Sequence, residues 1–253
     1  MKEITATIIT YNEEDRIAQC LTSLQGVADE IIVVDSYSTD KTVEICKDFN
    51  CKITQRKFNG FGFGAQKQYA VSLASHSYVL SVDADEILDE TMRQAIIKLK
   101  EDGFEHRIYS VSRLNFYCNK PIKHSGWHPD EPTRLFDKRY ATWNLRDVNE
   151  IVIFQPTITP HLIPGQLLHY KCNSYHEYAR KEESYALINS RILVKEGKKP
   201  WIITPYTKAA KAFVSTFILK LGIADGHEGK EISQVAARSA FITYRSARRN
   251  FNP

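Results

Sequence analysis

Apolar and polar positions along the first 100 residues predict strands separated by helices. Runs rich in β-branched and other apolar residues predict buried strands at 4–9, 30–34 and 78–82, and a weaker strand at 51–55. Apolar residues spaced three or four apart predict the helices between them and another after residue 89, and we expect Asn12, Asp40 and Asp89 to cap three of these helices. Strands joined by helices of this length form right-handed βαβ units and a mostly parallel sheet, so the fold class is α/β.

The pattern changes after residue 105. Alternation from 108 to 113 and apolar runs at 134–136 and 148–154 predict further strands, whereas prolines make 126–132 a loop. The last 80 residues predict three helices, at about 174–196, 205–221 and 230–249, the first opened by a capping box of Ser174 and Glu177. We therefore expect an α/β domain at 1–170, with halves 1–105 and 106–170, and a helical C-terminal extension at 171–253.

Polar residues follow three of the predicted strands. They are Thr10 to Glu13, Asp35, and the pair Asp83 and Asp85. The carboxyl ends of parallel strands share one edge of a sheet, where ligands bind, so these residues are candidates for one site. On an extended chain Asp83 and Asp85 face the same way and can hold a divalent cation, whereas Glu86 faces the loop or acceptor side. The alternative is a solvated acidic turn before a helix.

A nucleotide would suit this edge. Tyr11 can cover a base, Asp35 can accept a base or ribose hydrogen bond, and Lys67 can offset phosphate charge. The Gly-rich segment 59–64 matches neither a P-loop nor a dinucleotide fingerprint, and we interpret it as flexible backbone that approaches the ligand. Each residue also has a purely structural alternative: a core aromatic, a turn carboxylate and a solvated helix cation.

The uneven distribution of charge limits the kinds of partner that the chain is expected to bind. The 253 residues carry a net charge of +4, but residues 1–100 hold 11 Lys and Arg against 15 Asp and Glu, whereas residues 197–253 hold 10 against 3. A basic, amphipathic C-terminal region can lie on an anionic membrane surface, pack on the catalytic domain or form a subunit interface of a homo-oligomer. Nucleic acid is disfavoured because no recognised binding module accompanies the charge.

The cysteines and the N-terminus indicate a compartment. Five scattered cysteines, none in a C-x-x-C pair, indicate free thiols in a reducing environment, and no histidine spacing suits zinc. The N-terminal residues lack the pattern of a signal peptide, and no apolar stretch is long enough to span a bilayer. We expect a cytoplasmic protein, with peripheral attachment to the inner face of the cytoplasmic membrane as an option.

Four motifs, in this order, resemble those of family 2 glycosyltransferases: Ile8–Glu14, Ile31–Thr42, Gly62–Lys67 and Leu80–Glu86. Downstream pieces resemble the bacterial branch that includes lipopolysaccharide core β-glycosyltransferases: Trp127–Asp130, Arg134–Phe136, Val148–Glu150, Leu168–Tyr170, Tyr178 with Lys181, and Gly222 with Asp225–Gly226. The resemblance implies a GT-A fold, a nucleoside-diphosphate sugar donor, usually UDP-linked, and inversion at the anomeric carbon with Mg²⁺ or Mn²⁺.

Carried over by position, the resemblance assigns donor-binding roles to the first strand ends. Thr10, Tyr11, Asn12 and Glu13 would lie at the donor, and Asp35 would bind the nucleoside with Tyr11. The resemblance also places Asp83 at the ribose or the metal, and it makes Asp85 a ligand of the metal and the diphosphate.

An inverting transfer also needs a carboxylate that takes the acceptor proton. Glu150 is our choice because Val-Asn-Glu resembles the Val-His-Glu of that branch, with Asn149 in place of the histidine; Asp130 and Asp147 are alternatives. Trp127 could stack on a sugar, or could simply anchor its loop. Arg134 could hold a phosphate, or could make an ion pair.

The sequence thus predicts a metal-dependent inverting transferase that acts on a saccharide or lipid-linked saccharide, in lipopolysaccharide or cell-envelope glycan synthesis. Two rivals remain. A sugar-phosphate nucleotidyltransferase should carry a Gly-rich loop directly after its first strand, which this chain lacks. A non-catalytic protein that binds nucleotide sugars or glycans would not need both Asp85 and Glu150.

Overall fold

The computed structural model describes residues 2–58 and 62–251, so 59–61 of the predicted Gly-rich segment lie outside the described residues. Contacts divide the chain into two units. Unit 1 runs to Arg113 and takes in Asp130–His169, and unit 2 comprises Leu114–Pro129 and the described residues from Tyr170 onward. The predicted domain boundary at residue 170 stays a prediction, and this division groups Leu114–Pro129 with the C-terminal helices.

Unit 1 holds most of the strands. Its elements are β1 (Ile4–Thr10), α1 (Ile17–Leu24), β2 (Glu30–Asp35), α2 (Thr42–Asp48), β3 (Lys52–Gln55), α3 (Phe63–Leu73), β4 (Tyr78–Asp83), β5 (Glu86–Leu88), α4 (Glu90–Asp102), β8 (Thr133–Asp137), β9 (Ala141–Trp143) and β10 (Val152–Phe154). Two strands start in unit 1 and end in unit 2: β6 (Ile108–Tyr117) and β11 (His161–Cys172).

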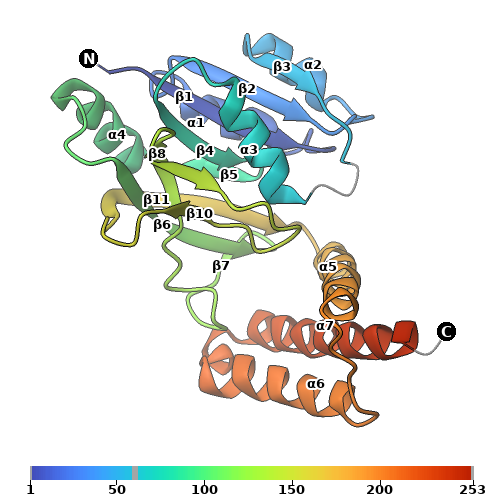
Figure 1. Cartoon of the computed structure of the whole chain (residues 1–253). Helices are drawn as coiled ribbons and strands as arrows, with labels where there is room; N and C mark the ends of the chain where they lie inside the picture. Colours follow the sequence, from blue (N-terminus) through green and yellow to red (C-terminus); the bar gives the residue numbers. More distant parts are fainter. Residues whose placement is uncertain (1, 59–61, 252–253) are drawn as a thin grey trace. The chain divides into compact units, whose positions relative to one another are not determined.

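The sheet begins with the order β3-β2-β1-β4, and all three neighbouring pairs of strands are parallel. It continues through β8, β6, β11 and β5, where the registered pairs β4–β8, β6–β8 and β5–β11 are antiparallel. Figure 1 shows this sheet with helices packed beside it. The α/β fold class is confirmed, with its parallel part in the first 100 residues.

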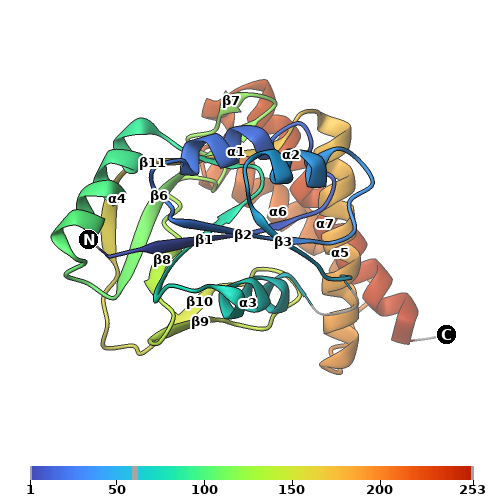
Figure 2. The same cartoon turned by 90° about the horizontal axis from the view of Figure 1, so that it is seen from above.

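Helices cover both faces of the parallel strands (Figure 2), with α1 and α2 on one face and α3, together with β9 and β10, on the other. The alternation of strand side chains explains the two layers. Ile4, Ala6 and Ile8 of β1 are fully buried in the core that includes α1. Ile32 and Val34 of β2 lie in the second core, with residues of α3.

Two predicted helix caps are confirmed. The Asp89 side chain accepts a hydrogen bond from the Met92 backbone N–H at 2.7 Å, and α4 begins directly after it. The Ser174 side chain accepts one from the Glu177 N–H at 3.2 Å at the start of the first C-terminal helix.

The predicted caps of the first two helices differ in the structure. Asn12 caps no helix, because α1 begins only at Ile17 and Asn12 has a left-handed φ of 54°. Its side chain instead accepts a hydrogen bond from the Thr39 N–H at 2.8 Å, which ties the turn after β1 to the turn after β2. The N-cap residue of α2 is Lys41 and not Asp40. The Asp40 side chain still accepts a hydrogen bond from the N–H of Thr42, the first residue of α2, at 3.0 Å.

Three strand predictions need correction. Residues 148–151 are not a strand, because β10 begins at Val152. The sequence analysis missed β5 and β11, since β5 has only three residues and the β11 sequence mixes charged, small and apolar residues without a clear period. These two strands pair with each other, so each forms through a long-range partner and not through a local pattern.

Unit 2 is mainly helical. Its elements are β7 (Lys120–Pro121), α5 (Tyr175–Lys195), α6 (Thr204–Val214), a π-helical turn (Ser215–Leu219), a 3₁₀ turn (Gly222–Asp225) and α7 (His227–Phe251). The predicted helix at 205–221 therefore ends as an α-helix at Val214. In Figure 1, α7 packs along α6, and contacts also join α7 to α5. None of the described helices is both long enough and apolar enough to cross a membrane.

One buried carboxylate ties four segments of unit 1 together. Glu30, the first residue of β2, accepts hydrogen bonds from the side chains of Thr5 and Lys52, each at 2.6 Å. It also accepts from Ser75, through the backbone N–H at 2.8 Å and the hydroxyl at 2.7 Å. Burial, the largest influence, raises the pKa of Glu30, but these donors outweigh it and lower that pKa from 4.5 to about 2.

We predict that Glu30→Gln lowers the free energy of unfolding at pH 7 by about 2–3 kcal/mol, because the amide cannot replace the charge-assisted hydrogen bonds. The folded-state pKa lies below the unfolded value, so this stabilisation is fully present above about pH 4.5 and disappears as pH falls towards 2. Urea denaturation of both proteins at several pH values should show the difference shrinking in acid. A constant difference would contradict the role of the charge.

Candidate active site

Three strand ends meet at one edge of the sheet in unit 1. β1 lies between β2 and β4, and its register pairs Thr10 with Asp35 and Ile9 with Asp83. The candidate residues that end these strands are therefore neighbours, as the strand-end argument requires. Their roles in donor binding stay predictions.

The geometry expected for Asp83 and Asp85 is wrong in one respect. The chain does not stay extended past Asp83, because Ala84 and Asp85 form a turn before β5. The Glu86 carboxylate folds back and accepts a hydrogen bond from the Asp83 backbone N–H at 2.9 Å. The turn, not a strand, therefore sets the directions of these carboxylates.

Lys67 links the predicted diphosphate site to the predicted base. Its ammonium lies 2.7 Å from Oδ1 of Asp83 and 2.8 Å from Oε1 of Glu150. The Lys67 side chain is 5% exposed, compared with 23% for Asp83 and 16% for Glu150. Lys67 thus lies between two carboxylates that are far apart in the sequence.

Arg134 forms the second link. Its Nη2 donates to Oδ2 of Asp83 at 2.9 Å and to Oε1 of Glu86 at 2.6 Å. Burial, the largest influence, raises the pKa of Asp83, but Lys67 and Arg134 together hold it well below its usual range. Burial likewise lowers the pKa of Arg134, and Glu86 and then Asp83 reverse this and raise it. Asp83 is therefore ionised at neutral pH.

Glu86 anchors a further pair of charges. It is fully buried, and its Oε1 accepts from Nη1 of Arg113 at 3.0 Å. Nε of Arg113 donates in turn to Oδ2 of Asp130 at 2.8 Å. Asp130, an alternative base, is thus ion-paired in unit 1, and Glu86 is a structural carboxylate between two arginines. We name the set Lys67, Asp83, Glu86, Arg113, Asp130, Arg134 and Glu150 the charge cluster.

Trp143 is a site residue that the sequence analysis missed. The Lys67 ammonium lies 4.8 Å from the centre of its ring and the Arg134 guanidinium 5.9 Å, both in cation–π geometry. Trp143 is 4% exposed, and its indole nitrogen has no hydrogen-bond partner among the described residues. Nothing local marks it, since it ends a strand of three residues.

Two glycines at the start of α3 allow the segment that precedes Glu150 to pack closely against this helix. A Cβ on Gly62 would lie 1.9 Å from Cα of Asp147, and one on Gly64 would lie 1.9 Å from the carbonyl oxygen of Asn144. The Gly64 N–H donates to the Arg146 carbonyl at 3.1 Å. The predicted close backbone approach therefore involves the protein's own 144–147 segment, which corrects our interpretation of these glycines as backbone freed for a ligand.

The turns at the donor edge differ in exposure. Tyr11 is 57% exposed, as a residue that covers a base would need to be, whereas Asp35 is fully buried. The Asp35 carboxylate accepts from the N–H groups of Tyr37 and Ser38 and from the amide of Gln55, at 3.0–3.2 Å. Asp35 therefore organises its own turn in this structure.

Asp85 and Glu13 have separate surroundings. Asp85 is 8% exposed, and its Oδ2 lies 3.4 Å from Nε2 of His169, which makes an ion pair when the histidine is protonated. The Glu13 N–H donates to the Thr42 hydroxyl at 2.8 Å, so it helps to fix the turn after β1. Thr10 is 5% exposed, and its hydroxyl has no partner among the described residues.

Trp127 belongs to unit 2. Its ring makes edge contacts with Tyr117 and Tyr178, at centroid distances of 6.3 and 5.6 Å, and the Lys171 ammonium lies 4.4 Å from its centre. These contacts make it an anchor of the aromatic core of that unit. Its predicted role at the acceptor stays a prediction.

Asp83 and Asp85 are the predicted ligands of a divalent cation. Within residues 2–58 and 62–251, no three His, Cys, Asp or Glu side chains are arranged to hold a metal ion. Asp83 and Asp85 still provide hard oxygen donors. Mg²⁺ is commonly bound by one or two carboxylates together with substrate phosphates, so a pair suits an ion shared with a diphosphate. The residues present therefore fit such a cation.

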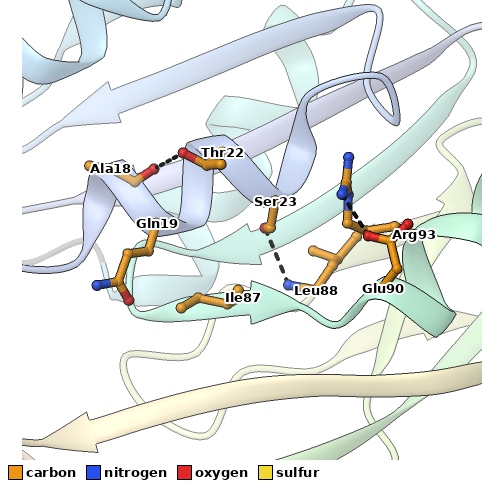
Figure 3. Close-up of a pocket in the computed structure, with 8 residues that line it drawn as sticks. All are labelled: Ala18, Gln19, Thr22, Ser23, Ile87, Leu88, Glu90 and Arg93. Atoms are coloured by element: carbon orange, nitrogen blue, oxygen red, sulfur yellow. Dashed lines mark hydrogen bonds and ion pairs between the residues drawn. The ribbon is translucent and has the colours of Figure 1, made fainter.

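A pocket elsewhere in unit 1 contains none of the predicted site residues. Figure 3 shows it between α1, β5 and the start of α4, with Ser23 accepting a hydrogen bond from the Leu88 N–H at 3.2 Å. Its lining includes Ala18, Ile87 and Arg93. The charge cluster, and not this pocket, carries the candidate chemistry.

Comparison with known proteins now identifies the family. The model of glycosyl transferase family 2 matches residues 5–158. The chain belongs to glycosyl transferase family 2. The match includes the strand ends and all seven residues of the charge cluster.

Three known proteins are similar to this chain. An uncharacterized glycosyltransferase of Rickettsia bellii is 28% identical over 95% of this chain and 84% of its own length. The lipopolysaccharide core biosynthesis glycosyltransferase LpsC of Rhizobium meliloti is 27% identical over 78% of this chain and 74% of its own. Glucosyl-3-phosphoglycerate synthase from Mycobacterium tuberculosis, solved with Mn²⁺ and UDP, covers 46% of this chain and 44% of its own at 20% identity, with a TM-score of 0.37.

We predict that Arg134→Ala lowers the free energy of unfolding by about 3–5 kcal/mol, because the fully buried Glu86 and the half-buried Asp83 lose the cation that they share and keep only Arg113 and Lys67 respectively. Arg238→Ala is the matched control: the Arg238 side chain is 56% exposed and pairs with Glu183 at 3.2 Å, so its removal should cost less than about 1 kcal/mol. Chemical denaturation at pH 7 measures both. Equal costs would show that the buried charges do not hold this edge together.

Proposed function

We propose that this chain is an inverting glycosyltransferase. It transfers a sugar from a nucleoside-diphosphate sugar, with a UDP-sugar as the preferred donor. The acceptor is a saccharide or lipid-linked saccharide of lipopolysaccharide or another cell-envelope glycan. The observation that carries the proposal is the position of Lys67 between Asp83 and Glu150, which joins the donor edge to a carboxylate base. The similarity to LpsC supports the envelope glycan.

The donor would bind along the ends of β1, β2 and β4. Exposed Tyr11 offers an aromatic face to the base. Asp35 would bind the nucleoside by exchanging one of its turn hydrogen bonds for one from the ligand. Thr10, Asn12 and Glu13 shape the turn around it.

Asp85, with Asp83 beside it, would hold Mg²⁺ or Mn²⁺ against the donor diphosphate. When bound, such a cation neutralises charge on the departing nucleoside diphosphate. The oxygen-rich donor set suits these hard cations better than zinc. Asp83 already lies against Lys67 and Arg134, so Asp85 would be the principal protein ligand.

Inversion requires a single displacement. The acceptor oxygen forms a bond to the anomeric carbon, the bond from that carbon to the diphosphate oxygen breaks, and the nucleoside diphosphate leaves. Glu150 takes the proton of the acceptor hydroxyl. Lys67 holds Glu150 through Oε1 and so fixes the direction of its carboxylate.

The acceptor-side residues would contribute unequally. Arg134 is 2% exposed and bound to two carboxylates, so we propose that it holds these in place and does not contact the acceptor. Asp130 is committed to Arg113, which favours Glu150 as the base. Trp127 remains a candidate for stacking on a sugar.

We predict that Asp85→Ala abolishes sugar transfer, measured as UDP release from UDP-sugars with Mn²⁺ or Mg²⁺, while the melting temperature without ligand changes little. The variant should also lose the cation-dependent rise in melting temperature that UDP produces, since a ligand that binds only the folded state stabilises it. Asp48→Ala, which removes an exposed carboxylate of unit 1, is the control. Full activity of the Asp85 variant would refute the metal role.

We predict that Glu150→Gln leaves UDP binding nearly unchanged but slows transfer by about 10²–10⁴-fold, the usual contribution of a general base. Asp130→Asn and Asp147→Asn should retain most of the activity. Single-turnover transfer and UDP thermal shifts on all three variants separate chemistry from binding. If Asp130→Asn or Asp147→Asn stops turnover and Glu150→Gln does not, the base is the residue that stopped it.

The rivals make different predictions. A non-catalytic binder would show UDP-sugar thermal shifts without UDP release under any cation. A sugar-phosphate nucleotidyltransferase would release pyrophosphate from a nucleoside triphosphate. Family 2 membership favours the transferase over both.

A further inference from the structure

The segment from Trp201 to Ile223 in unit 2 carries an unusual number of exposed apolar side chains. Trp201 is 80% exposed, Leu219 74% and Ile202 71%. The other exposed large apolar residues of the segment are Ile203, Tyr206, Val214, Ile218, Leu221 and Ile223. We name this set the apolar segment. Single exposed apolar residues are ordinary, but nine of them within residues 201–223 indicate a candidate interaction site.

Helix α6 packs on α7 but leaves apolar side chains of the segment exposed at both of its ends. The ring of Tyr206 lies 5.3 Å from that of Phe241 of α7. Exposed Ile203 directly precedes α6, exposed Val214 is its last residue, and exposed Ile218 follows in the π-helical turn. The contact with α7 therefore leaves apolar surface of the segment uncovered.

The positive charge around the apolar segment indicates which kind of partner binds there. Between residues 197 and 224 the chain holds five lysines and no aspartate or glutamate. All five lysines are exposed: Lys198, Lys199, Lys208, Lys211 and Lys220. Apolar side chains interleaved with lysines, with Trp and Tyr among them, are the composition of a surface that lies in the headgroup region of an anionic bilayer.

We propose that the apolar segment binds the surface of an anionic lipid bilayer. Trp201, Ile202 and Leu219 enter the interface between headgroups and acyl chains. The lysines remain among the lipid phosphates. The segment lies in the interface, consistent with the absence of a helix able to cross a membrane in the described part of the chain.

A second copy of the chain fits this surface less well. A two-fold interface brings the same patch of both copies together. It would place five lysines opposite five lysines, and residues 197–224 hold no acidic residue, although Lys198 pairs with Glu196 at 2.7 Å. Anionic lipid supplies the missing charge and the apolar phase together.

The test is co-sedimentation of the full chain with vesicles of phosphatidylcholine alone or mixed with phosphatidylglycerol. We expect binding to the mixed vesicles that weakens as salt rises, because the lysine–phosphate attraction is screened. Ile202→Ser with Leu219→Ser should weaken this binding at least about tenfold, since two strongly apolar side chains lose their contact with acyl chains. Leu187→Ser with Leu162→Ser, exposed to 43% and 45% but outside the segment, should bind like the unmodified chain.

A second pair of variants tests the charge. Lys208→Gln with Lys211→Gln should weaken binding to the mixed vesicles about thirtyfold, at roughly fivefold for each lysine near an anionic surface. Lys47→Gln with Lys98→Gln removes the same charge from exposed positions in unit 1 and should have little effect.

Three outcomes would overturn the proposal. The unmodified chain could fail to bind mixed vesicles, or the Ile202 and Leu219 variant could bind as tightly as the Leu187 and Leu162 control. Sedimentation equilibrium could instead show a dimer that the Ile202 and Leu219 variant loses, which would assign the surface to self-association. Thermal melts of all variants should coincide, because every replaced side chain is exposed.

Discussion

Unit 1 depends on the mutual neutralisation of buried charges at the carboxyl edge of its sheet. Removing an ion from water costs several kcal/mol, and only a close partner of opposite charge offsets that cost. Lys67 and Arg134 are 5% and 2% exposed, and both bind Asp83. Lys67 also pairs with Glu150, and Arg134 also pairs with Glu86. Helix α3, strands β4 and β8 and the segment before β10 are therefore held together by charges that could not be buried separately.

This constraint gives two features of the sequence a different meaning. Gly62 and Gly64 are glycines because the backbone of residues 144–147 passes where side chains would be. That segment leads to Glu150, so close packing delivers the carboxylate to Lys67. A lysine just after a Gly-rich segment suggests a phosphate ligand. Here its nearest partners are carboxylates, and any phosphate would have to share the ammonium with them.

The elements and site residues that depend on a local pattern of apolar and polar residues could be predicted from the sequence. Apolar runs located β1, β2 and β4, and the strand-end rule brought Thr10, Asp35 and Asp83 to one edge. What it missed depends on distant partners. Trp143 lies beneath Lys67 only because β9 packs beside α3, and the Asp83–Asp85 turn is set by Glu86 and the arginines it binds. No period in a sequence encodes such pairings, because their members belong to different elements.

In unit 2 the exposed apolar side chains bear on a choice of partner that charge alone leaves open. Lysines and arginines attract lipid, nucleic acid and acidic protein alike. Exposed Trp201 and Leu219 favour lipid over nucleic acid, because nucleic-acid phosphates offer an aliphatic side chain nothing to bury against, whereas acyl chains do. The helical pattern of 205–221 predicts one apolar side, that of Ala209, Phe213 and Phe217. In the structure α6 packs on α7, while Val214 and Leu219 remain exposed. A transferase whose acceptor is anchored in lipid would gain from such a surface, since enzyme and acceptor would then meet by diffusion within one plane.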